Sequence, residues 1–541
     1  MTVYSRSGSN IKYKFYQFLI PTVLGGLATS LNEFVDSIVV SQLLGSEAMG
    51  MVGMASPVMF AFGMVTILLG IGGSAVYAEY AGKHEKDKAE GVFSVVIVFS
   101  VLIAVILAIT GMVFIDPLAN FMCRSPELIS QFKPYTVILL LSGVLIIPVV
   151  VIAFFSPAFG SPQIGTMVTI ISNATNLLMD IVYIRFFDTG LKGAAMATFS
   201  GNLIGLFFIL IMIFSKKLAF PYRKTGPDRM ALLFEVVRKG APASISQLGF
   251  LIKVSFCNQL AMRLGGVQGI TTFTLCIQTL SVVSIGASGV LDSMIPIGAA
   301  LTGQGDHKGL KTLMKTVLTV QLIANMVFTV FFLVFPQSFC YLFNCTGEEA
   351  AAAVTGIRIF SLMFVFRGYV LIFLYYFQVI NRKIYASVIS CVDGFAGLIP
   401  IALILTDAFG INGLWMAFPV LSILMLAVIV PVNLCIAKKS NGKYSGIMLY
   451  EAEDSNISVY DATFTVGKDL ISDFIISLQD FCNKNINNKK TSMIVALASE
   501  EMLSYTCGYT FNKAPVEEID IMLKILPEEI MIDIRSLGEP I

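Results

Sequence analysis

Two carboxylates and an asparagine lie close together in an apolar stretch near the start of the chain. Asn32, Glu33 and Asp36 belong to the run NEFVDSIVV, inside a hydrophobic segment that spans residues 15–44. A charged side chain at a bilayer centre costs about 2.5–3.5 kcal/mol on insertion scales. Such residues therefore indicate a functional site inside the membrane.

A second polar cluster lies in the apolar segment 163–187, where Asn173, Asn176 and Asp180 occur. Residues four apart share one face of a helix, so Asn176 and Asp180 form one polar stripe, and Asn32 and Asp36 form another. Carboxylate and amide oxygens suit a hard cation such as sodium, and a buried carboxylate can instead carry a proton. Either way, the cluster predicts a cation-coupling site.

The depths of these residues favour one shared site. Asp36 and Asp180 each stand about eight residues, or about 12 Å, from the outer ends of their segments, and Thr198 stands about 8 Å from the same surface. We therefore predict that Asp36, Asn176, Asp180 and Thr198 bind the cation, as metal ligands if it is sodium. The alternative is that Asp36 and Asp180 only hold helices together, although serine or threonine would do so at lower cost.

Three further charged residues lie in apolar segments of the second half, namely Lys253, Arg367 and Asp393. Lys253 or Arg367 with Asp393 can form a structural ion pair or part of a substrate or proton path, and the sequence leaves both open. With Asn32, Glu33 and Asn173, these residues are candidates for the lining of a central cavity.

Composition places the chain in a membrane. Of its 541 residues 56% are hydrophobic and 13% are charged, with a mean hydropathy of +0.82. At about 20 residues per span, we expect an all-α bundle of twelve transmembrane helices, at 15–44, 51–80, 91–115, 134–157, 163–187, 193–215, 241–263, 270–302, 316–343, 352–380, 384–406 and 411–437.

Lysine and arginine orient the bundle. Twenty-one of them lie on the side of the N-terminus and of the loops after even-numbered spans, and six lie on the other side. The positive-inside rule then places both termini in the cytoplasm of a multi-pass protein of the cell membrane.

The chain also repeats itself after about 220 residues. IPTVLGGLATSLNEFVD aligns with APASISQLGFLIKVSFC, and DTGLKGAAMA aligns with AFGINGLWMA. Duplicated six-helix lobes are a common transporter plan. We therefore expect an N-terminal lobe (1–215), a cytosolic linker (216–240), a C-terminal lobe (241–437) and a small α/β cytosolic domain (438–541).

Three runs resemble the multidrug and toxic compound extrusion (MATE) family: VDSIVVSQLLGSEAMGMVGMASP, GIGGSAVYAEYAGKHEKDKA and NATNLLMDIVYIRFFDTGLKGAAMAT. The resemblance implies two lobes around a V-shaped cavity, and export of organic cations in exchange for Na⁺ or H⁺. It carries the family's ion site onto Asp36, Asn176, Asp180 and Thr198. Lys253 stands in span seven, where some family branches keep a glutamate, so the resemblance implies no second cation site with that residue.

The tail resembles the ATP-binding domain of anti-sigma-factor kinases and histidine kinases in IVALASEEMLSYTCGY and IMIDIRSLGEPI. Tyr505 stands where that family has a magnesium-binding asparagine, and Ser536 replaces an adenine-binding aspartate. The resemblance therefore implies a degenerate regulatory or dimerisation module, with a possible cytosolic protein partner for residues 440–541.

Together these features predict a secondary active exporter with a small organic substrate, a lipid bilayer around it, no cofactor and no nucleic-acid partner. The chain lacks the sequence motifs of a phosphate loop or a nucleophile elbow, so we expect no enzyme. Two alternatives are a flippase for lipid-linked saccharides and a membrane-tethered sensor that signals through its C-terminal domain.

Overall fold

The computed structural model describes residues 6–535 except 83–84, 123–125, 157, 160, 219–220, 222–228, 381, 452–456, 467–468, 487, 511–517 and 527–528. Side chains are also outside the described part at helical positions 21, 24–33, 78, 82, 126–128, 162, 242–243, 246, 285, 288, 348, 383 and 508–510. The predictions for the side chains of Asn32 and Glu33, and for Ser536, fall there.

Long helices make up the first 439 residues, because a helix satisfies its own backbone polar groups in an apolar surrounding. In the first half they are α1 (Ser9–Leu44), α2 (Ser46–Gly82), α3 (Lys86–Val113), α4 (Ile115–Met122), α5 (Pro126–Phe155), α6 (Pro162–Ile181), the π-helix η1 (Val182–Phe186) and α7 (Leu191–Phe214). In the second half they are α8 (Arg229–Gly303), α9 (His307–Val334), α10 (Pro336–Leu342), α11 (Gly347–Ser361), α12 (Met363–Val379), α13 (Lys383–Cys391), the π-helix η2 (Val392–Ala396), α14 (Leu398–Phe409) and α15 (Ile411–Lys439).

Within the described residues, ten helices are long and apolar enough to cross a membrane, and the segments Phe34–Leu44 and Gly289–Gly303 are shorter apolar helices. Large apolar side chains such as Ile106, Phe207 and Val327 are more than half exposed on the outer faces. A hydrocarbon environment explains that exposure, which water would oppose. The chain is therefore a multi-pass membrane protein.

Helix α8 consists of two helices that meet at a kink, because Gly266 has non-helical backbone angles. The expected spans 241–263 and 270–302 lie on the two sides of that kink. The first of the two helices begins at Arg229, inside the segment 216–240 that was expected to be the linker.

Glycines with positive φ mark equivalent turns in the two halves. Gly190, Gly266 and Gly410 have nearly the same backbone angles, with φ of 58–59° and ψ from −144° to −141°. Gly45 also has a positive φ, of 91°. Such angles strain any residue with a Cβ. The pairs Gly45 and Gly266, and Gly190 and Gly410, are about 220 positions apart, which agrees with the internal repeat.

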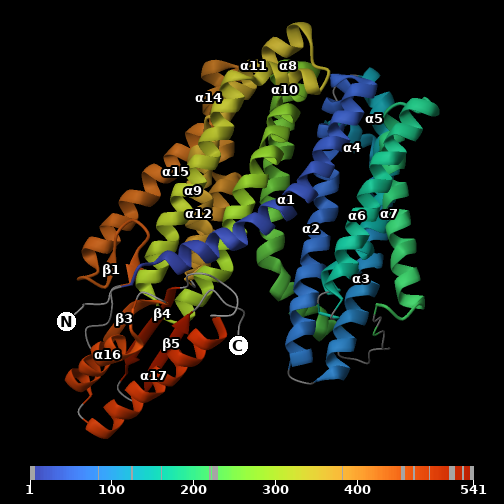
Figure 1. Cartoon of the computed structure of the whole chain (residues 1–541). Helices are drawn as coiled ribbons and strands as arrows, with labels where there is room; N and C mark the ends of the chain where they lie inside the picture. The colour runs from blue at the N-terminus through green and yellow to red at the C-terminus, as the bar shows by residue number, and fades with distance from the viewer. Residues whose placement is uncertain are drawn as a thin grey trace.

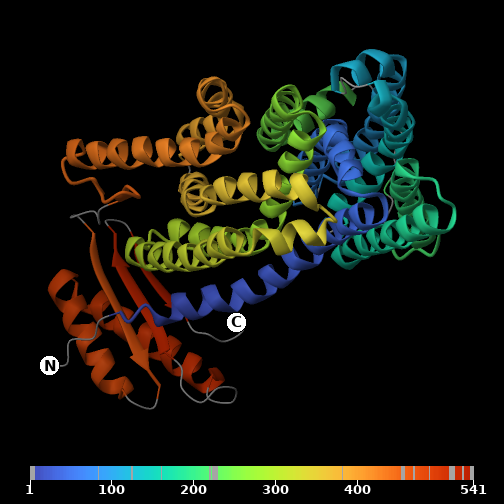
Figure 2. The same cartoon turned by 90° about the horizontal axis from the view of Figure 1, so that it is seen from above.

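The two halves lie side by side (Figure 1), with α2–α7 on one side and α9–α15 on the other. Helix α2 packs along α8, while α1 slants between the halves and contacts α8, α2 and α6. Figure 2 shows α1 running from the C-terminal sheet toward the first half. Helix α1 thus contacts both halves and reaches the C-terminal part of the chain.

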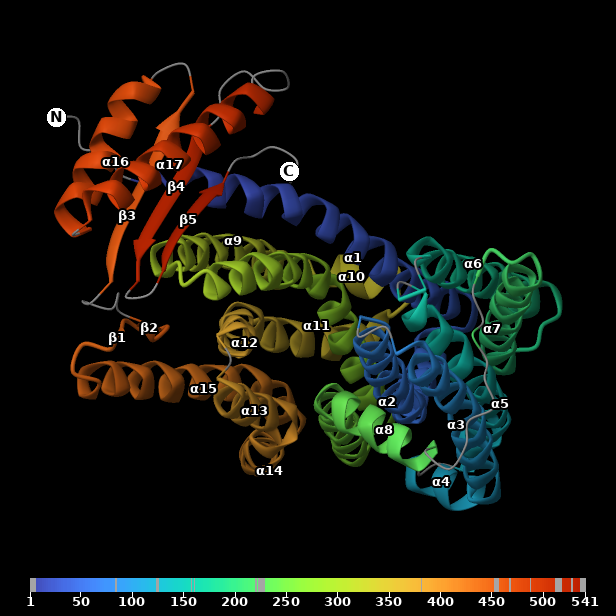
Figure 3. The ribbon, with the colours of Figure 1, turned by 90° about the horizontal axis from the view of Figure 1, so that it is seen from below.

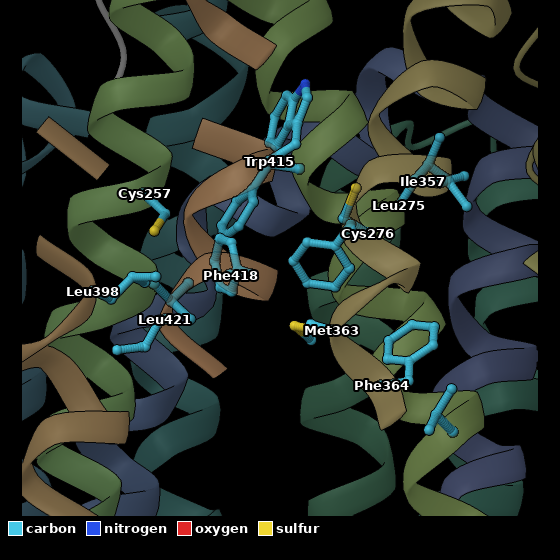
Figure 4. Packing of buried hydrophobic residues seen from close by; sticks show 14 of the residues in the cluster. Cys257, Leu275, Cys276, Ile357, Met363, Phe364, Leu398, Trp415, Phe418 and Leu421 are labelled. Atoms are coloured by element: carbon cyan, nitrogen blue, oxygen red, sulfur yellow. The ribbon is translucent and has the colours of Figure 1, made fainter. Parts of the chain in front are cut away.

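The largest hydrophobic core includes residues of both halves, and its part among α8, α11, α12 and α15 is shown in Figure 4. Trp415 is 1% exposed, and its ring stacks on Phe273 with centroids 6.2 Å apart. Met363 and Phe418 line the same core. Close packing of this kind holds the neighbouring helices in one arrangement.

The C-terminal part is a separate small domain (Figure 3). A short hairpin comes first, with β1 (Tyr444–Ser445) and β2 (Tyr450–Glu451), and is followed by β3 (Ser458–Thr465), α16 (Ile471–Asn485), α17 (Lys489–Thr510), β4 (Glu518–Ile525) and β5 (Ile530–Arg535). The three long strands form an antiparallel sheet in the order β3-β4-β5. The expected α/β domain therefore has segregated strands and helices rather than a parallel sheet.

Alternation along these strands gives the sheet two different faces. Ile519, Ile521 and Leu523 are fully buried against α16 and α17 in a core that belongs to this domain alone. Asp520 and Lys524 point to the opposite face, which lies toward the helical bundle. The domain thus presents a polar face to the bundle.

Candidate functional site: a carboxyl pair beside a cavity

Three helices bring the predicted cation ligands together. Asp36 comes from α1, Asn176 and Asp180 from α6, and Thr198 from α7. The Asn176 amide donates to Asp180 Oδ2 at 3.3 Å and to Thr198 Oγ1 at 3.5 Å. The carboxyl groups of Asp36 and Asp180 lie close enough to share a proton. Residues more than 160 positions apart therefore form one cluster.

Asp180 is fully buried, and its Oδ1 has no hydrogen-bond partner among the described residues. Two carboxyl groups in contact cannot both be ionised without a neutralising proton or cation between them. The cluster offers a hydroxyl, an amide and two carboxyl groups, which fit an alkali cation if the Asn176 side chain turns its oxygen inward. The same pair can hold one proton.

A close helix contact sets this geometry. A Cβ at Gly201 would lie 2.5 Å from the Ser172 carbonyl oxygen and 3.0 Å from Asn176 Cβ. Only glycine lets α7 approach α6 this closely, which places Thr198 beside Asn176. The π-helix η1 begins two residues after Asp180, and π-turns of this kind occur frequently at functional sites.

Tyr135 is a site residue that the sequence analysis missed. It is 5% exposed on α5 and interacts electrostatically with both Asp36 and Asp180. A tyrosine in an apolar segment is common, so the sequence offered no signal to single it out. Its position makes it a further polar group of the carboxyl cluster.

Asp36 also lines a cavity of about 340 Å³ between α1, α2 and α8. The Phe60 and Phe250 rings in its wall meet edge to face, with centroids 4.9 Å apart. Gln278 donates to Ser37 Oγ at 2.7 Å, and its Oε1 has no partner among the described residues. A mostly apolar cavity with a few polar groups is typical of small-molecule sites.

Phe60, Phe250 and Gln278 were not predicted, because each residue is ordinary in its local sequence. Only the packing of α2 and α8 against α1 gathers them around Asp36. Asn173 lies one turn before Asn176 and is half-buried. Among the predicted cavity residues of the first half, only the side chain of Asn173 lies in the described part, and it makes no hydrogen bond to another described residue.

In the second half, Lys253, Arg367 and Asp393 form one cluster. Asp393 Oδ2 lies 3.4 Å from Arg367 Nη2 and 3.9 Å from Lys253 Nζ. Lys253 Nζ also donates to the Asp393 carbonyl oxygen at 2.7 Å, within π-helix η2. The sequence left open which base pairs with Asp393, and the structure pairs both. Lys253 is adjacent to the cavity residues Phe250 and Val254 but points to Asp393.

Among the described residues, no group of three or more His, Cys, Asp or Glu side chains is arranged to hold a metal ion. A transition-metal centre therefore has no ligand set in the described part. The oxygen cluster around Asp180 is of a different kind, since it combines carboxyl groups with neutral amide and hydroxyl groups.

A buried ionisable cluster next to a cavity between two helical lobes defines a transporter-like architecture. The family model MatE matches residues 21–182. The chain is 23% identical over 412 residues to the multidrug export protein MepA of Staphylococcus haemolyticus, which covers 75% of this chain and 89% of that protein. It is 22% identical to the probable multidrug resistance protein YoeA of Bacillus subtilis, with 74% and 89% covered.

Solved structures agree with these relatives. The inward-facing conformation of a multidrug resistance MATE family transporter has a TM-score of 0.67 at 21% identity, covering 73% of this chain and 92% of that one. The outward-facing conformation of such a transporter has a TM-score of 0.61 at 22% identity, covering 77% and 94%. The chain therefore has the fold of MATE transporters.

Proposed function

We propose that this protein is a secondary active efflux transporter of the MATE family that exports organic compounds. The observation that supports this most directly is the position of Asp36, which touches the buried carboxyl cluster and also lines the cavity. One side chain thus links a cation site to a substrate site. The names of the relatives support multidrug export, and they do not favour the flippase or the sensor.

In the proposed cycle, substrate enters the cavity from the cytoplasm, binding of a proton or a sodium ion at Asp36 and Asp180 reshapes the N-terminal lobe, and the lobes rock to release the substrate outside. Binding or release of that ion changes which charge faces the cavity. The ion can shift the equilibrium between inward- and outward-open states only by its differential affinity for them. Asn176 and Thr198 would supply neutral ligands to sodium.

The proposed topology has twelve spans in two six-helix lobes, 1–215 and 241–437. The two shorter apolar helices, in α1 and at the end of α8, would belong to spans one and eight. The charge distribution supports cytoplasmic termini in the cell membrane, with residues 438–541 as a cytosolic domain. We propose no cofactor beyond the coupling ion.

Efflux from proteoliposomes tests the proposal. Purified protein is reconstituted with an organic cationic dye, and a sodium gradient or a pH gradient is imposed separately. Asp36→Asn and Asp180→Asn are compared with wild type, and Asp407→Asn, an exposed carboxyl on α14, is the matched control.

We expect one gradient to drive efflux, loss of at least about tenfold in both site variants and no loss in the control. Wild-type protein that exports no dye under either gradient would contradict the transporter assignment. Efflux that persists in folded Asp36→Asn and Asp180→Asn would contradict the site instead.

A further inference from the structure

An ion cluster joins the C-terminal domain to the bundle. Both carboxylate oxygens of Asp306, in the turn between α8 and α9, lie 2.7 Å from Arg6 Nη1, just before α1. Arg535 at the end of β5 binds the same carboxylate. Asp461 on β3 and Asp520 on β4 lie 3.5 and 3.8 Å from the Arg6 guanidinium.

These charges are removed from solvent. The side chains of Arg6, Asp306, Asp461 and Asp520 are at most 7% exposed, and that of Arg535 is 17% exposed. Burial alone would raise the pKa of Asp306, but the charges of Arg6 and Arg535 outweigh it and hold that pKa below its ordinary value. Asp306 is therefore ionised at neutral pH.

Backbone contacts extend the same junction. Lys524 on β4 donates to the carbonyl oxygens of Gln304 and Gly305 at 2.5 and 2.8 Å. On the other side, the Ser7 amide donates to Thr463 Oγ1 at 2.9 Å, and Asn10 Nδ2 donates to the Glu518 carbonyl oxygen at 2.7 Å. The polar face of the sheet thus holds the start of α1 and the α8–α9 turn together. We call this set of contacts the clamp.

The clamp is built to be releasable. The domain has its own hydrophobic core, which is separate from the cores of the bundle. Its firm attachment is the preceding hairpin, where Met448 and Leu449 are buried in the core of the bundle. A cavity of about 520 Å³, lined by Lys308, Lys443 and Asp461 among others, lies at the junction. The contact there is polar and incompletely packed, unlike the interior of a domain.

Helix α1 connects the clamp to the carboxyl cluster. Near its start it is held by the sheet, and eight residues before its end at Leu44 it carries Asp36. Between these points, Thr22 contacts Ser293 on α8 at 2.8 Å. Movement of the lobes that changes the slant of α1 must therefore displace its start from the α8–α9 turn or carry the whole clamp with it.

We propose that residues 458–535 form an autoinhibitory domain, whose clamp on Arg6 and Asp306 stabilises the present conformation and slows transport. This inference rests on the proposed function. Contacts made in one conformation and lost in another shift the equilibrium toward the first. The clamp contacts are made in the present conformation, so the clamp slows the change from this conformation to the other state of the cycle.

Two substitutions open the clamp in the full-length protein. Asp306→Asn removes the charge but keeps an N-cap for α9, since the side chain accepts from the Gly309 amide and asparagine caps as well as aspartate. Lys524→Met removes two backbone contacts without touching the buried charges. Lys484→Met, on the exposed surface of α16, is the control.

Two readouts are recorded for each variant: the initial rate of dye efflux, and amide hydrogen exchange over residues 7–12 and 304–309. We expect both clamp variants to exchange faster in these segments and to export about fivefold faster or more, the lower end of typical coupling between sites. The control should match wild type in both.

Faster exchange with unchanged or slower efflux would overturn the autoinhibitory role, and unchanged exchange would overturn the clamp itself. If even wild-type protein exports no dye, the transporter proposal fails. The exchange data still decide whether the clamp exists, so the two failures are distinguishable.

Discussion

The Asp36 carboxyl on α1 lies against the Asp180 carboxyl on α6, and Asp36 alone of the two borders the cavity between α1, α2 and α8. Asp180 is fully buried behind it. Asp180 is therefore the inner residue of the pair and Asp36 the outer one. A change in charge at Asp180 alters the electrostatic potential in the cavity through its contact with Asp36.

The effects of substitutions at Asp36 and Asp180 on efflux should not be additive. If Asp36 and Asp180 bind one ion together, removing either carboxyl destroys the site, and removing both costs no more. We expect Asp36→Asn, Asp180→Asn and the double variant to show the same residual efflux in proteoliposomes. A double variant at least tenfold worse than each single one would mean that the two residues act independently.

The contact of Gly201 with α6 predicts a specific packing defect. Gly201→Val would push α7 from α6 and separate Thr198 from Asn176, at a cost of about 1–3 kcal/mol in the free energy of unfolding. We expect a lower Tm together with weaker ion dependence of efflux. Gly303→Ala is the control, because a Cβ there meets no atom within 4 Å. An unchanged Tm in Gly201→Val would refute the close contact.

We predict that Gln278 contributes a polar contact to a dye bound in the cavity. Gln278→Leu keeps the approximate volume but removes the unpaired Oε1, whose hydrogen bond to a bound dye would be worth about 1 kcal/mol. We expect dye affinity, measured by fluorescence polarisation, to fall about fivefold. Gln163→Leu, on the exposed side of α6, should bind dye as wild type does. Equal affinity in both variants would place the dye elsewhere.

Substitutions in the cluster around Asp393 distinguish a structural role of this cluster from a role in transport. Lys253→Met leaves Asp393 with Arg367, whereas Asp393→Asn leaves two bases without their carboxylate. Since an uncompensated buried charge costs about 3–5 kcal/mol, we expect Asp393→Asn to lower Tm more than Lys253→Met. If Lys253→Met is stable and exports dye normally, the cluster is structural. Loss of efflux at an unchanged Tm would instead assign Lys253 to the transport path.

Acid should release the clamp through Asp306. The pKa of this carboxyl is below its ordinary value of 3.8 when the clamp is closed. Its contribution to docking is therefore present above that value and is lost as pH falls through the lower, docked-state pKa. Burial raises the pKa of Asp461 in the same cluster, which gives a contribution of opposite sign.

The comparison of wild type with Asp306→Asn isolates the first of these contributions. Hydrogen exchange at residues 7–12 should differ between the two proteins at pH 7, and the difference should disappear only below pH 3.8, as pH falls through the lower docked-state pKa of Asp306. A difference that stays constant across this range would show that the Asp306 charge has no part in docking.

Much of the site could be predicted because its chemistry is costly in an apolar segment. Asp36, Asn176, Asp180 and Thr198 stand out in the sequence, and helical spacing with depth from the membrane surface is enough to group them. Gln278, Phe60 and Tyr135 do not stand out, since the same residue types occur elsewhere in the chain with no such role. Their importance depends on contacts between helices that are distant in sequence.

The fold shows the same division. Apolar runs, the placement of lysine and arginine, and glycines repeated after about 220 residues determined the helices, the duplication and the expected orientation, because these features depend on local composition and backbone sterics. Alternation in the last strands likewise determined which residues share a face. Periodicity in one chain, however, specifies faces and not partners. Only the tertiary structure decided that Lys253 and Arg367 share Asp393, that Asp36 borders a cavity, and that Arg6 meets Asp306 beneath the C-terminal sheet. Each of these arrangements requires helices or strands that are not neighbours in sequence to pack in one register, and the two partners are 140 residues apart for Lys253 and Asp393 and 300 apart for Arg6 and Asp306.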